Sequence, residues 1–355
     1  MSGIVLKVKG EWYESWQSID VKTSMDYGTG LFSLLSNDFF GMEFSDWNIR
    51  MGDSCVLEIE DTKVITGYID SITITGTEDT GYVEIKGRDK TGDLLDCSFS
   101  ETANEWKLCP IIKIIKDLCS PFSIDVEIDP LITADVSMIV PTFKADEGLS
   151  VFSIIKYLCN DVGILPLSYG DGKLFLTRTS KIDYNFDTLI PGENVIRTKF
   201  VCSDVDRYSI YTVKGQGVGS ENKTLKDYIT PTGTMSDSGI KRYRPVTIFS
   251  DTPTDNKRAK DRAAWECHKN AGQSRKVFYD LSGWTQFDGS IWRINSLAIV
   301  FDNRFEITKT MLIEDVEYIF TEDGGEIVTL GLVDIDTYST SPLLSPLLTT
   351  GLDRE

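Results

Sequence analysis

The sequence has one histidine, His268, and no CxxC pair among its seven cysteines. General acid–base catalysis relies on histidine more than on any other side chain, and zinc sites need several His or Cys ligands. His268 and Cys267 are neighbours on a predicted helix, where adjacent side chains point to different faces. We therefore expect a structural His268, no metal site and no cofactor. The odd, scattered set of cysteines also argues for reduced thiols rather than disulfides.

Long apolar runs are absent as well. No stretch approaches the roughly 20 residues that cross a bilayer. The N-terminal segment MSGIVLKVKGEWYESW lacks the apolar core and small-residue cleavage site of a signal peptide. We expect a chain without a membrane anchor that is made in a cytoplasm, unless it leaves as part of an assembly.

Basic residues are scarce relative to acidic ones. The chain has 36 Lys and Arg against 55 Asp and Glu, for a net charge of −19. Because phosphate binding needs clustered Lys and Arg, this chain is expected to repel nucleic acid, although DNA could still pass nearby. A solvated acidic surface that keeps the protein soluble explains the charge equally well.

What the sequence does contain is β-type alternation at both ends. Residues 1–98 include alternating runs such as KVITGYIDSITITG (63–76) and GYVEIKG (81–87), joined by short turns. Closely spaced strands of this kind favour an antiparallel sandwich or barrel. Strands resume at about 181 and continue to 336, with a polar excursion at 217–240 and a helix predicted at 254–271. This helix begins at Thr254 or Asp255 and ends at Gly272.

Two helices are predicted between these β regions, at 110–119 and 151–159, because apolar residues recur there at helical spacing. Each leads into an extended run, and an offset of 40 aligns the two, which indicates a small α/β layer of two like units. A hairpin with Asp171-Gly172 as its turn closes the layer.

The expected fold class is mainly β with an α+β or α/β lobe. The predicted division of the chain is a first β domain at 1–98, a lobe at 99–200 joined by an inserted segment at about 217–272, a second β domain at 201–216 and 273–337, and a low-complexity tail at 338–355. The tail is either disordered or docked on a partner.

An internal match links the two β domains. At an offset of 244, residues 69–87 align with residues 313–331, so that Asp70 meets Glu314 and the turn Thr-Glu-Asp recurs. Either the first and last β domains share a design, or two acidic hairpins use the same turn residues independently.

The densest cluster of reactive residue types is GRDKTGDLLDCS, residues 87–98. Arg88 is flanked by aspartates and can fasten the end of a strand to the next segment through charge-assisted hydrogen bonds. A catalytic Cys97 would need a base, and nothing nearby marks this thiol as activated. We interpret the cluster as structural.

Other candidate sites are weaker. No spacing singles out a glycosidase-type carboxylate pair. GQGVGS (215–220) lacks the strand–loop–helix context of a phosphate loop, which favours a flexible linker, and NKT (222–224) is a glycosylation acceptor only in a secreted protein. The aromatic segment 281–296 could be a sugar-binding platform, but a barrel core or a protein interface is more common. No catalytic, cofactor-binding or metal-binding residue is therefore predicted.

The order of these features is similar to the baseplate hub proteins of Mu-like contractile-tail phages, the tail protein P or late control D-like family. The resemblance rests on VITGYIDSI, GRDKTGDLLDCS, GILPL, DGKLFLTR, YSIYTVKGQ and the aromatic segment with MLIEDVEYIFTEDGGEIVTLGLVD. It covers residues 5–337 and leaves out the tail.

The resemblance implies a non-enzymatic homotrimeric ring in the virion, at the centre of the tail baseplate, assembled in the host cytoplasm. Each subunit would carry two tail-tube-like antiparallel β-barrels, so that three chains present six barrels to a hexameric tube above and a threefold spike below. Implied partners are a tail tube or tube-initiating protein, the central spike and surrounding baseplate proteins. DNA would pass through the bore without specific binding.

Two alternatives remain at this point. One is a cell-wall or glycan hydrolase that uses a carboxylate pair, and the other is a glycan-binding tail module built around Trp284 and Trp292.

Overall fold

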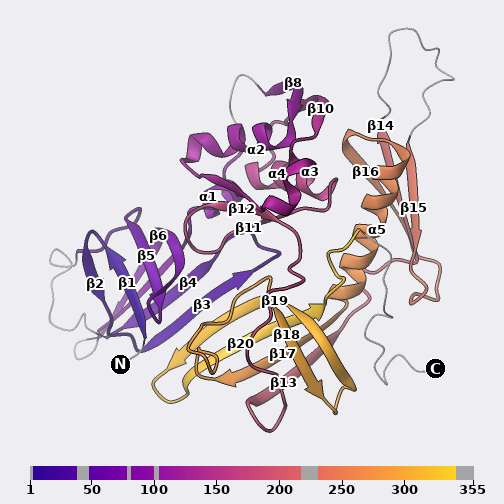
Figure 1. The fold of residues 1–355 in the computed structure, drawn as a ribbon. Helices are drawn as coiled ribbons and strands as arrows, with labels where there is room; N and C mark the ends of the chain where they lie inside the picture. The colour runs from indigo at the N-terminus through magenta and orange to yellow at the C-terminus, as the bar shows by residue number, and fades with distance from the viewer. Residues whose placement is uncertain (1–2, 38–47, 78–80, 100–103, 217–230, 341–355) are drawn as a thin grey trace, which may run out of the picture.

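The computed structural model describes residues 3–37, 48–77, 81–99, 104–216 and 231–340. Figure 1 shows a large β-sheet region with a helical lobe above it and a smaller helix–sheet lobe at its side. The three regions have separate hydrophobic cores. The large sheet is mainly antiparallel and positions everything else.

The first half of the large sheet is called here the first β-unit. Its strands alternate buried apolar residues with exposed or half-buried polar ones, so one face covers the core and the other is open. The spatial order is β3-β4-β7-β6-β5-β1-β2, with every neighbouring pair antiparallel. The strands are β1 (Ile4–Val8), β2 (Glu11–Tyr13), β3 (Ser18–Ser24), β4 (Leu31–Ser36), β5 (Ser54–Ile59), β6 (Thr62–Gly76) and β7 (Gly81–Asp89).

The second β-unit repeats this topology. Its spatial order is β13-β17-β20-β19-β18, again antiparallel throughout. Strands β3–β7 of the first unit and the five strands of the second both lie in the order first, second, fifth, fourth, third along the chain, whereas β1 and β2 have no counterpart. This makes β6 the counterpart of β19 and β3 the counterpart of β13. The strands are β13 (Val195–Cys202), β17 (Arg275–Ser282), β18 (Leu297–Asp302), β19 (Ile307–Thr321) and β20 (Gly325–Asp334).

The internal sequence match falls on equivalent hairpins. Strands β6 and β19 are both 15 residues long. Their pairing with β7 and β20 shifts register between Ile69 and Ser71 in one unit and between Ile313 and Asp315 in the other. Each shift is a β-bulge that leaves one extra residue, Asp70 or Glu314, and bends the strand. The offset of 244 aligns these two extra residues.

The two units are joined directly. Strand β3 pairs with β4 on one side and with the C-terminal half of β19 on the other, which creates one 12-stranded sheet over one hydrophobic core. Among the described residues the strand pairing follows an open path. The mainly antiparallel β fold is confirmed, and two closed barrels stay a prediction.

The helical lobe follows the first β-unit. The helices expected at 110–119 and 151–159 are confirmed as α2 (Ile111–Cys119) and α4 (Val151–Asn160), and the Ser150 hydroxyl accepts the Ser153 N–H at the start of α4 (3.2 Å). The hairpin around Asp171-Gly172 is also confirmed, with Gly172 at a φ of +77°. The other elements are α1 (Gly92–Asp96), β8 (Glu105–Pro110), β9 (Val126–Ile128), α3 (Thr133–Val136), β10 (Ile139–Lys144), β11 (Leu165–Leu167) and β12 (Leu174–Thr177).

The helix–sheet lobe is inserted between β13 and β17. It consists of β14 (Ile210–Gln216), β15 (Thr232–Ser236), β16 (Pro245–Pro253) and α5 (Asn256–Gln273). The predicted start of α5 is confirmed, because the Asp255 carboxylate accepts the Arg258 N–H (2.9 Å), and the helix continues one residue past Gly272.

Two strands lie in a different region from the one expected. The sequence predicts residues 201–216 in the second β domain and residues up to 200 in the lobe. Strand β14 instead pairs with β15 and β16, because the buried side chains of Tyr211 and Val213 pack against α5. Strand β13 belongs to the large sheet. Strand β15 lies within the polar excursion 217–240, of which residues 217–230 are outside the described part.

Candidate assembly surface

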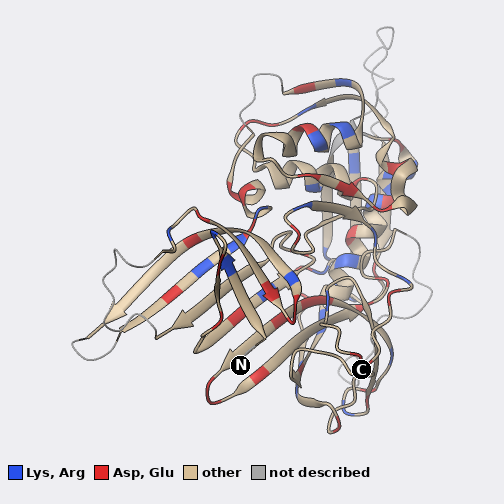
Figure 2. Ribbon diagram, turned by 60° about the vertical axis from the view of Figure 1, so that its left-hand side comes forward, with Lys and Arg blue, Asp and Glu red and all other residues tan. Residues whose placement is uncertain are grey.

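The open face of the large sheet carries alternating charges, and Figure 2 shows acidic and basic residues interleaved along its strands. Lys22 on β3 lies between Asp20 (3.0 Å) and Glu317 of β19 (2.8 Å), so it bridges the two units. Four further basic residues on this face are also ion-paired with carboxylates: Lys86, Arg88, Arg197 and Lys276. These pairs neutralise five basic residues of the face, while Lys199 of β13 lies over the Phe278 ring (5.6 Å to its centroid).

Residues 87–98 form the exit from the first β-unit. Arg88 at the end of β7 donates to Asp70 (2.6 Å) and to Asp96 in α1 (2.7 Å). The hydrogen bonds to Asp96 and Asp70 raise the pKa of Arg88. The prediction that this arginine fastens the strand to the next segment is confirmed, and Cys97 is an exposed thiol.

Next to Arg88, Asp89 faces the interior and is only 2% exposed. Its carboxyl group accepts a hydrogen bond from the Ser168 hydroxyl (2.8 Å), which ties β7 to the hairpin of the helical lobe. Burial raises the pKa of Asp89 to about 7, more than the hydrogen bond from Ser168 lowers it. The native state therefore keeps a proton that the unfolded chain releases near its ordinary pKa of 3.8.

This difference predicts a pH effect. Because the folded-state pKa is the higher one, the contribution of Asp89 to stability is fully present below about pH 4 and is lost as pH rises toward 7. From pH 5 to pH 8 the wild type should lose about 2–3 kcal/mol of unfolding free energy that Asp89→Asn keeps, because the amide does not titrate. Urea unfolding at both pH values measures the difference, and an unchanged difference would show that the carboxyl group titrates normally.

A second buried carboxylate lies where the two units meet. Glu314, the extra residue of the β19 bulge, is 0% exposed. Lys276 of β17 forms an ion pair with it, and Gln273 (3.2 Å) and Tyr338 donate hydrogen bonds to it. Burial alone would lower the pKa of Lys276, but the charges of Glu314 and Asp315 raise it. The counterpart Asp70 instead lies on the surface.

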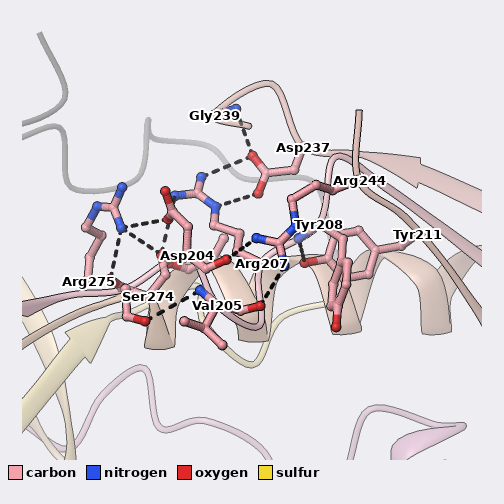
Figure 3. Close-up of polar contacts among 12 residues, drawn as sticks. Asp204, Val205, Arg207, Tyr208, Tyr211, Asp237, Gly239, Arg244, Ser274 and Arg275 are labelled. Atoms are coloured by element: carbon pink, nitrogen blue, oxygen red, sulfur yellow. Dashed lines mark hydrogen bonds and ion pairs between the residues drawn. The ribbon is translucent and has the colours of Figure 1, made fainter. Parts of the chain in front are cut away.

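The helix–sheet lobe is anchored by an arginine network, shown in Figure 3. Arg207 is 5% exposed and binds the Asp237 carboxylate through two nitrogens, at 2.6 and 3.1 Å. Ser274, at the C-terminal end of α5, accepts a further hydrogen bond from Arg207 (3.3 Å). Arg275, at the start of β17, donates to Asp204 (3.0 Å). The network therefore connects the lobe to the second β-unit.

His268, which we expect to be structural, and its neighbour Cys267 are both buried on α5. His268 is 0% exposed and its Nδ1 lies 2.7 Å from the carbonyl oxygen of Ser339, while burial raises the pKa of Cys267 to about 12. Neither is placed for catalysis. The described residues contain no group of three His, Cys, Asp or Glu side chains that could hold a metal ion.

The two tryptophans of the aromatic segment are core residues and do not form a sugar platform. Trp284 and Trp292 are both 1% exposed, and the Trp284 indole donates to the carbonyl of Ile319 (3.2 Å). A glycan cannot stack on rings that are covered, so the glycan-binding alternative loses its basis. Residues 217–220 of the glycine-rich segment and the NKT triplet at 222–224 lie outside the described residues.

Within the part of the chain that the structure describes, no helix is both long and apolar enough to span a bilayer. Of the predicted tail, the described residues 338–340 follow β20, and the ring of Tyr338 packs 6.2 Å from that of Trp265 on α5. Residues 341–355 are outside the described part.

Three family models match successive parts of the chain. The N-terminal domain of the GpP-like Mu phage baseplate assembly protein matches residues 3–89. The second domain of the gp44-like baseplate hub protein matches residues 91–178, and the fourth domain of the Mu phage baseplate assembly protein GpP matches residues 255–340. These matches define a component of a phage tail baseplate.

Relatives of similar length narrow this class. The baseplate hub protein gp44 of Escherichia phage Mu is 31% identical over 327 residues, which cover 91% of this chain and 85% of gp44. The chain belongs to the gp44-type baseplate hub family of Mu-like phages. The 43 kDa tail protein of prophage MuSo2 from Shewanella oneidensis superposes with a TM-score of 0.81, at 28% identity, over 95% of this chain and 99% of that one.

A tail protein from Neisseria meningitidis MC58 shares the fold, with a TM-score of 0.80 at 18% identity, over 95% of this chain and 97% of that chain. Family membership confirms a structural protein of the phage tail baseplate in the virion, and not an enzyme. The hydrolase alternative is therefore wrong.

Proposed function

We propose that three copies of this chain form a closed ring at the centre of the baseplate, in which each copy contributes two tube-like β-barrels. Six equivalent β-units would then face a hexameric tail tube or tube-initiating protein, while the threefold symmetry of the ring suits a central spike. Surrounding baseplate proteins would bind the outside, and the helical lobe (α1–α4) and the helix–sheet lobe offer the surfaces for them.

The repeated topology carries this proposal. Two units with the same strand order and a bulge at the same position give one chain two nearly equivalent copies of one surface. A trimer of such chains can present six similar positions, which one copy of the unit per chain could not do.

The same ring would provide a path for DNA. A surface along which DNA slides must not hold phosphates, and exposed unpaired Lys and Arg are what hold them. On the open face of the sheet Lys22, Lys86 and Arg88 are bound to carboxylates. This charge pattern supports the assignment of the open face to the wall of the channel.

Native mass spectrometry and negative-stain imaging of the purified protein test the ring. We expect a species of three times the chain mass of 39.8 kDa at micromolar concentration, with a central hole in the averaged images. A chain that stays monomeric at that concentration, or a trimer without a hole, would contradict the proposal.

A further inference from the structure

Two strand edges in this molecule lack a partner that their counterparts have. On the β5 side, β6 is paired only as far as Ile69, in the part of the chain that the structure describes. There β13 pairs with no strand other than β17, and only its first residue, Val195, has a bridge to Pro191. The counterparts of these two edges are residues 315–321 of β19 and the outer edge of β3, which pair with each other. The free edges therefore correspond to the two halves of a junction that already exists within the chain.

The exposure of the side chains differs in the same way. In the β3–β19 junction Tyr318 is 1% exposed and Val21 is 0% exposed. Their counterparts are Ile74, which is 39% exposed, and Phe200, which is half-buried. Apolar residues on an unpaired strand edge indicate that another strand covers them in the assembled state.

The backbone groups of the two free edges point outward at matching positions. The Ser203 N–H donates to the carbonyl oxygen of Ser274 on the β17 side (2.9 Å). The backbone N–H and C=O groups of successive residues point alternately to the two sides of a strand. Phe200, three residues before Ser203, therefore directs its N–H and C=O to the free side. In β19, the Glu314 carbonyl accepts from Met25 on the β3 side (3.0 Å). By the same alternation, the backbone N–H and C=O of Tyr318, four residues after Glu314, also point toward β3. The corresponding groups of its counterpart Ile74 therefore point to the free edge of β6.

The register follows from equivalent pairs. Val21 lies opposite Phe32 of β4 and opposite Tyr318 of β19. Phe200 lies opposite Val277 of β17, the counterpart of Phe32, so Phe200 takes the place of Val21. Since Ile74 takes the place of Tyr318, a repeat of the junction sets Phe200 opposite Ile74.

We propose that β13 of one subunit pairs antiparallel with residues 72–76 of β6 in a second copy of this chain, with Phe200 opposite Ile74 and Lys199 opposite Thr75. This proposal rests on the ring described above and names the contact that closes it. The β3–β19 junction joins the two units within a subunit, and the β13–β6 junction joins one subunit to the next. Such a contact is heterologous, and it forms a ring when the rotation closes.

Cross-linking tests the register. The variant Thr75→Cys/Lys199→Cys, in a Cys97→Ser/Cys202→Ser background, places two cysteines at directly opposite positions. Thr75 and Lys199 would form a non-hydrogen-bonded pair, next to the hydrogen-bonded pair of Phe200 and Ile74. Opposite Cβ atoms in an antiparallel pair lie about 4.5–5.5 Å apart, and they are closest at non-hydrogen-bonded positions, within reach of a disulfide. Oxidation should convert most of the protein into a covalent trimer on a non-reducing gel. Each single-cysteine variant should remain a single chain on the same gel.

A pair of proline variants tests the edge itself. Ile74→Pro removes an N–H that points to the free edge, so the subunit should fold normally but its trimer should dissociate at a concentration at least tenfold higher. Thr75→Pro is the matched control, because its N–H points to β7 and its loss should lower the melting temperature of the subunit. Mass photometry over a dilution series and thermal unfolding give the two readouts.

The outcomes separate this proposal from the ring. Suppose that the wild type is a trimer, but Thr75→Cys/Lys199→Cys does not cross-link and Ile74→Pro does not weaken the trimer. This result would overturn the strand pairing and leave the ring intact. A wild-type protein that is monomeric at micromolar concentration would overturn the ring and the pairing together. Cross-linked trimer with a weakened Ile74→Pro assembly supports both.

Discussion

Replacing Lys276 by methionine should lower the free energy of unfolding by about 3–5 kcal/mol, because the carboxylate of Glu314 is then buried without its cation. Glu314 is 0% exposed, and its other partners, Gln273 and Tyr338, donate hydrogen bonds but carry no charge. Guanidinium unfolding measures the loss. Wild type and variant must be compared at one protein concentration, since association adds to the apparent stability.

Two further variants control this result. Lys276→Met/Glu314→Gln removes both charges and should recover a large part of the loss. Lys113→Met breaks an exposed ion pair with Asp117 on α2 and should have a much smaller effect than Lys276→Met. Equal, small losses in Lys276→Met and Lys113→Met would show that water reaches Glu314.

Much of the architecture was predictable because each local pattern agrees with its surroundings. Buried and half-buried residues alternate from Ile65 to Ile69 in β6, and α2 and α4 carry one apolar stripe each. The repeat at an offset of 244 was visible since the bulge and the turn each demand particular residues, so Asp70 and Glu314 kept aligned positions. The role of Arg88 was predictable because one of its carboxylate partners, Asp96, lies within the same cluster, although the other, Asp70, does not.

The misplaced strands show where local patterns stop being informative. Strands β13 and β14 are both short and alternating, and only the helix α5, about 45 residues further on, decides that β14 leaves the large sheet. The same holds for the buried charges. The sequence around Asp89 does not indicate that its hydrogen-bond partner is Ser168, 79 residues away. Likewise, Glu314 and its partner Lys276 are 38 residues apart. Burial of a charge depends on which segments cover it, and that is a tertiary property.

Arg207 offers the second large effect, because it holds an inserted lobe onto the sheet rather than one strand onto another. Arg207→Met should lower the free energy of unfolding by about 3–5 kcal/mol, since Asp237 is only 8% exposed and would lose both of its arginine hydrogen bonds. Arg207→Lys keeps the charge but not the planar fork, so an intermediate loss is expected. Denaturant unfolding followed by tryptophan fluorescence measures both.

The location of the damage distinguishes a lobe anchor from a general core residue. In Arg207→Met, amide hydrogen exchange should accelerate first in β14–β16 and α5, because the network joins these elements to Ser274 and Arg275 at the start of β17. The first β-unit contains no member of the network and should keep its protection. Arg207→Met/Asp237→Asn should restore part of the protection in the lobe, as the unpaired charge is gone. Uniformly faster exchange in both β-units would mean instead that the lobe and the sheet unfold as one cooperative body.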